Sequence, residues 1–288
     1  MNNNIDRWHY RMLNDSTRNK KYSETIQKKI KLLKSNFSKM KILDIGTGTG
    51  LLSAQFFTNL KNEDLDNTKI FACESNEFFY EISSRFLKTV DHRGIINVIN
   101  KHSNDLKIED LGNSSIDLII TEIFDDCLLG ENCLDTFYHA LSVNGLVNKN
   151  SDSECQIIPK SAKIYLAAIE SKDIRNSSVS QYKNNTGTST KIIFRSIDNA
   201  KAFKKKYIRN AEPYTTEDLN SVDFKFLTDP IELNELQIEF NNLEMLEHFC
   251  KYNRTKNINK KLKVIREGVL DAFVIWFDLN LGKELLEY

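Results

Sequence analysis

Three glycines early in the chain have the spacing of a small-molecule site. Gly46, Gly48 and Gly50 directly follow the apolar segment 42–45, which has the pattern of a buried strand. The stretch 51–60 beyond them has the spacing of a helix. Glycine permits a tight turn between a strand and a helix and lets a ligand approach the backbone, and the helix N-terminus adds unpaired N–H groups. The turn is therefore predicted to bind a small molecule.

The glycine spacing narrows the class of ligand. A dinucleotide-binding turn has the pattern G-x-G-x-x-G, whose third glycine would fall at Leu51. The pattern here, D-x-G-x-G-x-G, is similar to the first motif of S-adenosylmethionine-dependent methyltransferases. Asp44 could receive the amine of that cofactor directly or through water, and Glu74 could take both ribose hydroxyls. The alternative is a surface turn with a helix-capping acid. This interpretation is weaker, because a strand precedes the turn, a helix follows it and an acid lies downstream.

A second candidate site lies in an acidic stretch. Residues 108–148 contain eight acids and no lysine or arginine. Glu122 ends an apolar strand pattern, and Glu131 follows Gly130 at the start of the next helix pattern. Two carboxylates on one loop repel each other unless a cation lies between them, and a guanidinium matches them best because it is planar and permanently charged. The alternative is that these acids solvate a loop and favour a helix N-terminus.

The first half of the chain alternates between helix and strand patterns. Such alternation predicts an α/β fold with a parallel sheet covered on both faces. The expected helices cover about 14–35, 51–60, 77–90 and 131–142, and the expected strands cover 41–46, 69–74, 95–100 and 116–123.

After Pro159 the pattern changes to strands, which predicts two domains, 1–158 and 159–288. The second is expected to be antiparallel, because several strands alternate with period two. A polar stretch at 171–190 is either a loop or an arm used in assembly. The expected strands are Lys163–Glu170, Lys191–Ile197, Val222–Leu227, Leu236–Phe240 and Ala272–Leu281.

Composition limits the remaining classes of function. Forty basic and forty acidic residues give no net charge and hence no electrostatic reason to expect nucleic acid as a partner. The five cysteines form no CxxC pair, which indicates reduced thiols rather than disulfides or a metal site, and hence a cytoplasmic or nuclear protein. The start of the chain has no apolar signal segment, and no apolar run approaches a membrane span, so no membrane partner is expected.

Several segments in the same order resemble the protein arginine N-methyltransferases, and in particular their monomethylating type III branch, the seventh subfamily. The resemblance implies a Rossmann-like cofactor domain, an antiparallel β-barrel-like domain, a dimerisation arm that forms a homodimer, and a substrate channel. The segments that carry it are RWHYRMLNDSTRNKKY at 7–22, LDIGTGTGLLS at 43–53, VINKHS at 98–103, TEIFDDCLLGE at 121–131 and YTTEDLNSVDFKFLTDP at 214–230.

The resemblance also implies roles for single residues. Glu122 and Glu131 match the loop of two glutamates that grips the substrate guanidinium, so these are the expected catalytic residues. Arg18 matches the arginine that pairs with the cofactor carboxylate. The implied contacts of S-adenosylmethionine are His9, Met12, Arg18, Asp44, Gly46, Gly48, Gly50, Glu74, Ser103 and Asn104.

The sequence also departs from the family pattern. It contains no His-Trp dipeptide, whereas the family has a THW loop whose histidine pairs with the acid matched by Asp15. Family members of the type III branch often carry two methyltransferase modules in tandem, and this sequence has one. The expectation is an active site open on that side, with cofactor binding and weak turnover.

The expected activity is methyl transfer from S-adenosylmethionine to an arginine nitrogen of Arg/Gly-rich or basic protein segments. A methyltransferase for a small molecule or for RNA is one alternative, although the acidic loop would repel RNA phosphates. An assembly partner that keeps the fold without activity is the other.

Overall fold

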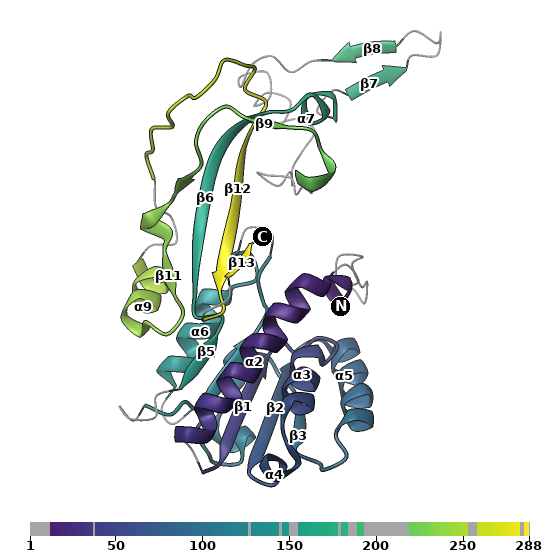
Figure 1. The fold of residues 1–288 in the computed structure, drawn as a ribbon, viewed down its shortest axis with the longest axis vertical. Coiled ribbons are helices and arrows are strands. Elements are labelled where there is room, and N and C mark those ends of the chain that lie inside the picture. The colour runs from purple at the N-terminus through teal and green to yellow at the C-terminus, as the bar shows by residue number, and fades with distance from the viewer. Residues whose placement is uncertain are drawn as a thin grey trace. The chain divides into compact units, whose positions relative to one another are not determined.

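A computed structural model describes residues 12–36, 38–125, 128–143, 146–149, 155–177, 180–183, 189–192, 219–252, 258–282 and 285–287. The chain forms two compact units (Figure 1). The first contains Met1–Ile164, Asn234–Ile258 and Phe277–Tyr288, and the second contains Tyr165–Leu233 and Asn259–Trp276.

The core of the first unit is a five-stranded parallel sheet. Its strands are β1 (Met40–Ile45), β2 (Thr68–Glu74), β3 (Ile96–Asn100), β4 (Leu118–Thr121) and β5 (Gln156–Ile158), in the order β3-β2-β1-β4-β5. The central strands are buried almost throughout, which is why their sequences are nearly continuous apolar runs. The strand order reverses between β1 and β4. Strands β2 and β3 lie on one side of β1, whereas β4 and β5 lie on its other side.

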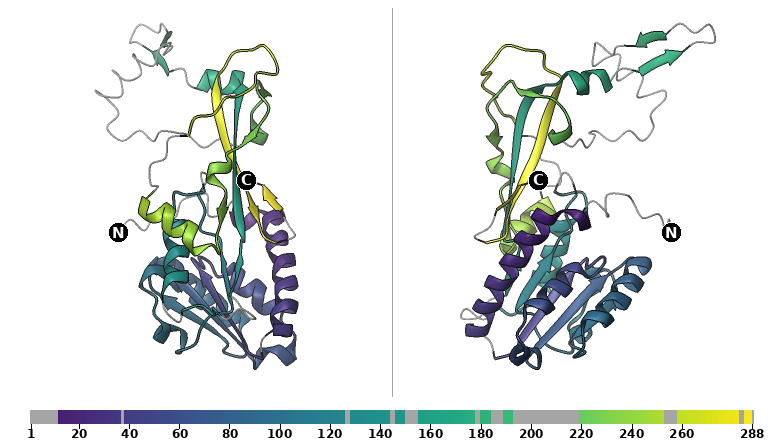
Figure 2. Two further views of the ribbon diagram at one scale, coloured as in Figure 1. Left: turned by 90° about the vertical axis from the view of Figure 1, so that its left-hand side faces the viewer. Right: turned by 45° about the vertical axis from the view of Figure 1, so that its right-hand side comes forward.

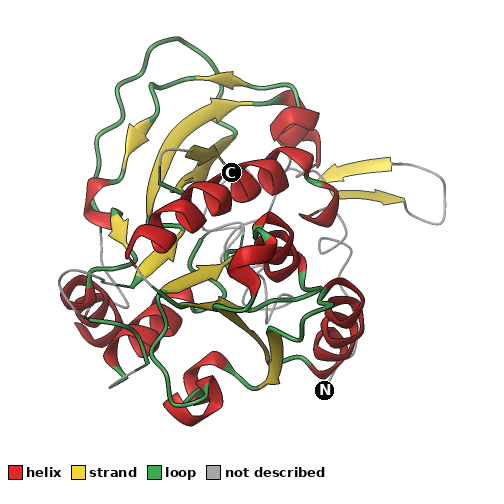
Figure 3. Cartoon of the chain, turned by 60° about the horizontal axis from the view of Figure 1, so that its bottom comes forward, coloured by secondary structure: helices red, strands yellow, loops and turns green. Residues whose placement is uncertain are grey.

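Helices with one buried face pack around this sheet, as the red helices and yellow strands of Figure 3 show. They are α2 (Ser16–Asn36), α3 (Leu51–Asn59), the single turn α4 (Asn62–Leu65), α5 (Glu77–Val90) and α6 (Cys133–Ser142). Asp15 caps α2, since its Oδ1 accepts a hydrogen bond from the backbone N–H of Arg18 at 2.9 Å. Asn76 caps α5 in the same way through the N–H groups of Phe78 and Phe79.

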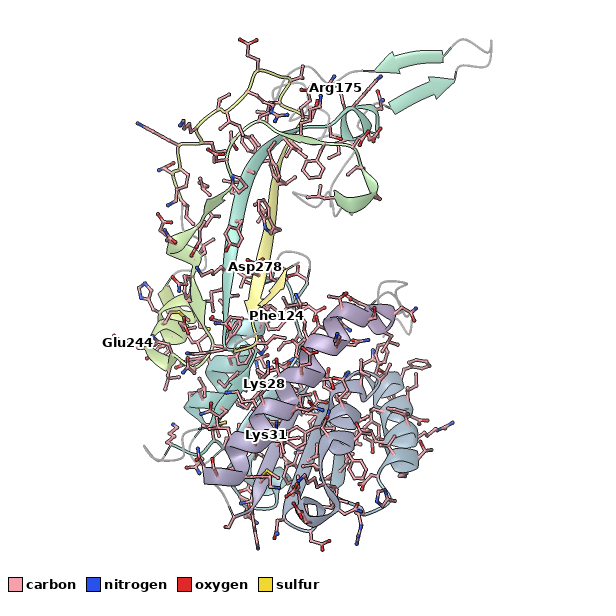
Figure 4. All side chains as sticks on the ribbon, in the orientation of Figure 1. Lys28, Lys31, Phe124, Arg175, Glu244 and Asp278 are labelled. Carbon is pink, nitrogen blue, oxygen red and sulfur yellow. The ribbon has the colours of Figure 1, made fainter. Side chains whose placement is uncertain are left out.

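Two later parts of the chain complete the first unit. Helix α9 (Leu243–Tyr252) contacts α6, and the short strand β13 (Leu285–Glu287) pairs with the end of β12 (Ala272–Asn280). The ring of Phe240 is fully buried and stacks on Phe137 of α6 with ring centroids 4.5 Å apart. It also contacts Phe124, 5.5 Å away, which follows Glu122 in the acidic loop and is labelled in Figure 4. The aromatic cluster therefore anchors this loop.

The second unit contains part of an antiparallel sheet. Strand β6 (Ser161–Glu170) pairs with β9 (Lys225–Phe226) and β10 (Ile231–Glu232) in this unit and with β11 (Ile238–Glu239) in the first. After β6 come the helix α7 (Lys172–Ser177) and a separate hairpin, β7 (Ser180–Lys183) and β8 (Ser189–Ile192), which Figure 2 shows in two further views.

A half-exposed arginine on a buried aspartate fixes α7 to the sheet of the second unit. The guanidinium of Arg175, labelled in Figure 4, donates two hydrogen bonds of 2.7 Å to the carboxylate of Asp271. It also contacts Glu170 at 3.2 Å. The pairing with Arg175 holds the pKa of the Asp271 carboxyl below its usual range. Because the pair is bidentate, it fixes the orientation of Arg175 on the sheet.

Most elements agree with the sequence analysis to within a few residues, and the differences have local causes. The expected strand 116–123 is confined to Leu118–Thr121. The expected strand 236–240 begins at the last residue of the single turn η4 (Asn234–Leu236) and forms only the short strand β11. Helix α9 and strand β5 were not expected. The expected strand Lys191–Ile197 lies mostly outside the described residues. The expected boundary after residue 158 gives two continuous segments, whereas the compact units interleave because β6 and β12 run through both.

Among the residues that the structure describes, none of the helices combines the length and apolar character needed to cross a membrane. The same residues contain no cluster of histidine, cysteine and acidic side chains that could hold a metal ion.

The aromatic cluster provides a test of the packing. Replacing Phe240 by alanine is expected to lower the free energy of unfolding by about 3–5 kcal/mol, because it leaves a cavity between Phe124 and Phe137. Urea denaturation measures the change. Phe86→Ala is the matched control, since that ring is 41% exposed on α5, and its loss should cost far less. Equal losses in the two variants would contradict this account.

Candidate functional site

A cavity of about 390 Å³ lies in the first unit at the carboxyl ends of β1, β2 and β4. This is the position where the strand order reverses, and such a reversal leaves a crevice in open α/β sheets. The expected site residues that line it are Met12, Arg18, Gly46, Gly48, Glu74, Ser103, Glu122 and Glu131. The fold therefore brings residues of both predicted sites into one cavity.

Asp44 is directed into the protein rather than into the cavity. The side chain is fully buried, and its Oδ2 accepts hydrogen bonds from the Thr47 hydroxyl at 2.6 Å and the Ser53 hydroxyl at 2.7 Å. It also accepts one from the backbone N–H of Ser53 at 3.1 Å. Asp44 therefore ties the glycine turn to the start of α3. Burial raises the pKa of this carboxyl to about 6, with the nearby charge of Glu74 as a smaller cause.

The three glycines of the turn have different surroundings. All have φ between +55° and +90°, a region that favours glycine. Gly46 and Gly48 line the cavity, whereas Gly50 packs against Leu87 of α5 and is not among the lining residues. A side chain at Gly46 would meet Ile123, the residue after Glu122. The turn thus packs closely against the segment that follows β4.

Glu74 is held by two backbone amides at the edge of the cavity. Its Oε2 accepts a hydrogen bond from the N–H of Gly48 at 2.9 Å, and its Oε1 accepts one from the N–H of Asn76 at 2.7 Å. A carboxylate has about four acceptor positions, so this side chain retains acceptor capacity. It is oriented in advance for a ligand that offers two hydroxyl groups.

Arg18 is a buried cation in the cavity wall. Its side chain is 7% exposed, and its Nη1 lies 3.2 Å from Oε2 of Glu122, whose side chain is 9% exposed. The Nη2 donates a hydrogen bond to the carbonyl oxygen of Met12 at 2.6 Å. Among the described residues, Nη1 has no partner with hydrogen-bond geometry. A buried donor on a charged group that lacks such a bond is costly, which favours an added acceptor at this point.

The carboxyl end of β4 is fixed by two hydrogen bonds. The hydroxyl of Tyr22, one turn after Arg18 on α2, donates to the carbonyl oxygen of Thr121 at 3.0 Å. The hydroxyl of Thr121 donates to the carbonyl oxygen of Ile45 at 2.7 Å. These bonds hold the backbone next to Glu122 between β1 and α2.

The loop from Glu122 to Glu131 is closed by another acid. The Oδ1 of Asp125 accepts a hydrogen bond from the N–H of Gly130 at 2.8 Å, and its carbonyl oxygen accepts one from the N–H of Leu128 at 2.8 Å. A side chain at Gly130 would overlap the Asp125 carboxylate. Glycine is therefore required at position 130, because the Asp125 carboxylate lies too close for a side chain there. The next residue, Glu131, lines the cavity.

The remaining expected residues lie in different positions. His9 lies outside the described residues. Ser103 lines the cavity, whereas Asn104 is not among the lining residues and donates its backbone N–H to Nδ1 of His102. Asp15, for which the resemblance implies a histidine partner, caps α2.

Sequence reasoning missed the residues that position the site: Tyr22, Thr47, Ser53, Asn76, Thr121 and Asp125. Only Asp125 had a visible signal, because it lies five residues before a glycine between the two glutamates.

The fold and the site define a class of protein. A parallel sheet with a glycine turn after β1 and an acid after β2, followed by an antiparallel sheet, is the arrangement of a Rossmann-like methyltransferase domain joined to a β domain. Solved structures agree with this assignment of the fold. The PRMT1 enzyme–prozyme heterotetrameric complex of Trypanosoma brucei with AdoHcy has a TM-score of 0.66 and 17% identity, covering 98% of this chain and 76% of that one. Protein arginine methyltransferase 10 of Arabidopsis thaliana has a TM-score of 0.63 and 18% identity, covering 98% and 77%.

Sequence comparison identifies the relatives. The chain is 31% identical over 294 residues to protein arginine N-methyltransferase 9 of Xenopus laevis, which covers 97% of this chain and 32% of the relative. The human protein of that name gives 31% over 291 residues with the same coverage. Protein arginine N-methyltransferase 7 of Gallus gallus gives 34% over 166 residues, which is 56% of this chain and 22% of the relative. No family model matches.

These similarities confirm the resemblance to the protein arginine N-methyltransferases. The chain spans about a third of the length of the first of these relatives.

The buried Asp44 predicts a specific pH response. Its pKa in the folded state, about 6, lies above its usual value near 4, so the folded state binds this proton more tightly than the unfolded state. The resulting stabilisation is largest below the unfolded pKa and is lost as pH rises through about 6. Between pH 7 and pH 5, the free energy of unfolding should therefore rise by about 1 kcal/mol more in the wild type than in Asp44→Asn.

Urea denaturation at both pH values measures this difference. Asp66→Asn is the control for loss of a carboxylate, because the Asp66 side chain is 80% exposed. An identical pH response in the wild type and Asp44→Asn would show that the buried carboxyl does not titrate as described.

Proposed function

We propose that this chain binds S-adenosylmethionine and transfers its methyl group to a side-chain nitrogen of arginine in a protein substrate. The observation that carries the proposal is the convergence of Arg18, Glu74, Glu122 and Glu131 on one cavity. Each of these groups matches a different chemical feature of the two reactants.

The cavity fits the cofactor in two respects. Glu74 keeps acceptor capacity for the two ribose hydroxyls, and Nη1 of Arg18 is a buried donor suited to a carboxylate. Met12 and Ser103 supply further wall contacts. When bound, the sulfonium group of the cofactor supplies an electrophilic methyl group.

The two glutamates fit the other reactant. A guanidinium is a poor nucleophile because its lone pairs are delocalised and its pKa exceeds about 12. Glu122 and Glu131 would orient one nitrogen toward the methyl group and hold the positive charge on the others. No strong base is required at the start, since the proton leaves after methyl transfer has begun.

The relatives support the choice of substrate, because they are named protein arginine N-methyltransferases. Arg/Gly-rich or basic segments are the proposed substrates, since the acidic residues of the loop attract cations. The resemblance to the type III branch implies one methyl group per arginine, and the cytoplasm or nucleus is the proposed location.

Glu122→Gln tests the assignment of reactants. It keeps the shape of the side chain and removes its charge, so transfer to an arginine-rich peptide should be abolished, while affinity for S-adenosylhomocysteine should stay within a few-fold. Glu74→Ala should instead weaken the binding of S-adenosylhomocysteine by about 1–3 kcal/mol, because hydrogen bonds to a charged acceptor are lost. Calorimetry and mass spectrometry of the peptide provide the two readouts, and the peptide mass gives the number of methyl groups.

The outcomes separate the candidate functions. Transfer at the wild-type rate by Glu122→Gln would refute the role of the two glutamates. S-Adenosylhomocysteine binding without transfer by the wild type would favour the assembly-partner alternative. Equal S-adenosylhomocysteine affinity in the wild type and Glu74→Ala would refute the cofactor site.

We also propose that the segment 171–210 mediates a two-fold homodimer. A polar stretch of this length between strands is uncommon unless it is functional. The segment begins with the helix α7, which the Arg175–Asp271 pair fixes to the sheet. Two-fold dimers are the commonest oligomers, and the related structure from Trypanosoma brucei is a heterotetramer.

Replacing residues 180–192 by a short Gly-Ser linker should convert a dimer into a monomer, because it removes the hairpin and keeps α7 with its ion pair. Light scattering at high micromolar concentration measures the mass, and an unchanged melting temperature at low concentration would show that the fold is intact. A monomeric wild type, or a variant that still dimerises, would count against the arm.

A further inference from the structure

The ion pair between Arg18 and Glu122 links the two halves of the cavity. Their charged groups lie 3.2 Å apart, and both side chains are more than nine-tenths buried. Burial makes this attraction stronger than it would be at the surface, where water screens charges. Each member therefore stabilises the charge of the other.

Each member is also the group that one of the proposed reactants requires. A ligand carboxylate would pair with Arg18, and a substrate guanidinium would pair with Glu122. This inference therefore rests on the proposed function. A guanidinium that reached Glu122 first would compete with Arg18, and displacing Arg18 would leave a buried cation without its counter-ion, which is costly.

The backbones of the two residues are fixed, so an exchange of partners would take place in the side chains. Arg18 lies in the first turn of α2, where its backbone N–H donates to the capping Asp15, and its guanidinium donates to the carbonyl oxygen of Met12. The carbonyl group next to Glu122 is held by Tyr22. Arg18 and Tyr22 lie one turn apart on α2. This helix therefore contacts the side chain of Glu122 through Arg18 and the carbonyl oxygen of the preceding residue, Thr121, through Tyr22.

We propose that Arg18 couples the two binding events: a carboxylate-bearing ligand at Arg18 strengthens the binding of an arginine side chain at Glu122. The ligand carboxylate, Arg18, Glu122 and the substrate guanidinium then form a row of alternating charges. The carboxylate replaces Glu122 as the counter-ion of Arg18, and Glu122 becomes available to the substrate. The coupling is reciprocal, so an arginine peptide strengthens binding of the ligand by the same factor.

Calorimetry with two ligands that differ in the carboxylate tests the coupling. S-Adenosylhomocysteine carries the amino acid portion, whereas 5′-methylthioadenosine keeps the nucleoside and thioether and lacks the carboxylate. An arginine-rich peptide should bind roughly tenfold more tightly to the chain saturated with S-adenosylhomocysteine than to the chain alone. Saturation with 5′-methylthioadenosine should leave peptide affinity within about twofold, because nothing then replaces Glu122 at Arg18.

Variants identify the residue that transmits the effect. In Arg18→Gln, peptide affinity should be the same with and without saturating S-adenosylhomocysteine. Arg18→Lys keeps the charge and should retain part of the enhancement. Glu74→Ala is the matched control, because it weakens the nucleoside contact without touching the ion pair, so the enhancement at saturation should remain.

The results separate this inference from the proposed function. If both ligands bind and the peptide affinity does not depend on S-adenosylhomocysteine, the coupling is refuted while the proposed function stands. Enhancement that persists in Arg18→Gln, or that 5′-methylthioadenosine reproduces, would also refute it. A chain that binds no arginine peptide under any condition would overturn the proposed function and the coupling together.

Discussion

The hydrogen bond between the Thr121 hydroxyl and the Ile45 carbonyl oxygen joins the carboxyl ends of β1 and β4, where the strand order reverses. Two of the segments that give the cavity its chemistry extend from these two strand ends. The glycine turn leaves β1, and Glu122 leaves β4. Parallel pairing of the two strands is the constraint that makes a nucleoside site and an acidic loop neighbours, since parallel strands present their carboxyl ends at one edge of the sheet.

Charged side chains in and beside this cavity are held by groups of the protein itself. Asp44 is turned inward and its Oδ2 is satisfied by hydroxyl groups and an amide, Glu74 is held by two amides, and Glu122 is paired with Arg18. Buried charges are tolerated only when they are paired or hydrogen-bonded. Two of these pairings use groups that the proposed reactants also need. The charged groups that the protein itself pairs or holds by hydrogen bonds are thus the groups that would recognise the ligands.

The acidic loop depends on residues from the far half of the chain. Phe124 packs on Phe240, which follows β11 and stacks on Phe137 of α6. Asp125 and Gly130 close the loop from within. The compact unit that holds the site therefore includes Asn234–Ile258, and a fragment ending after β5 would lack the aromatic ring that anchors the loop.

The sequence by itself determined the elements and the chemical identity of the site. The apolar runs of β1 and β2, the glycine turn and the acid at Glu74 are local patterns, and local patterns survive translation into structure because they depend on backbone sterics and burial. The similarity of Arg18, Glu122 and Glu131 to a known family supplied their roles. Helix α9 was not expected, since its residues follow short strands in a stretch interpreted as a β domain.

Tertiary structure alone decided which of these residues meet. The contact of Arg18 with Glu122, the inward direction of Asp44, the packing of Gly50 on Leu87 and the bond from Tyr22 to Thr121 join segments that no sequence pattern pairs. The reason is physical. A local pattern fixes the type of an element, whereas the partner of a buried charge or hydroxyl depends on the strand order and on which helix face is covered, and both are set by packing of the whole unit.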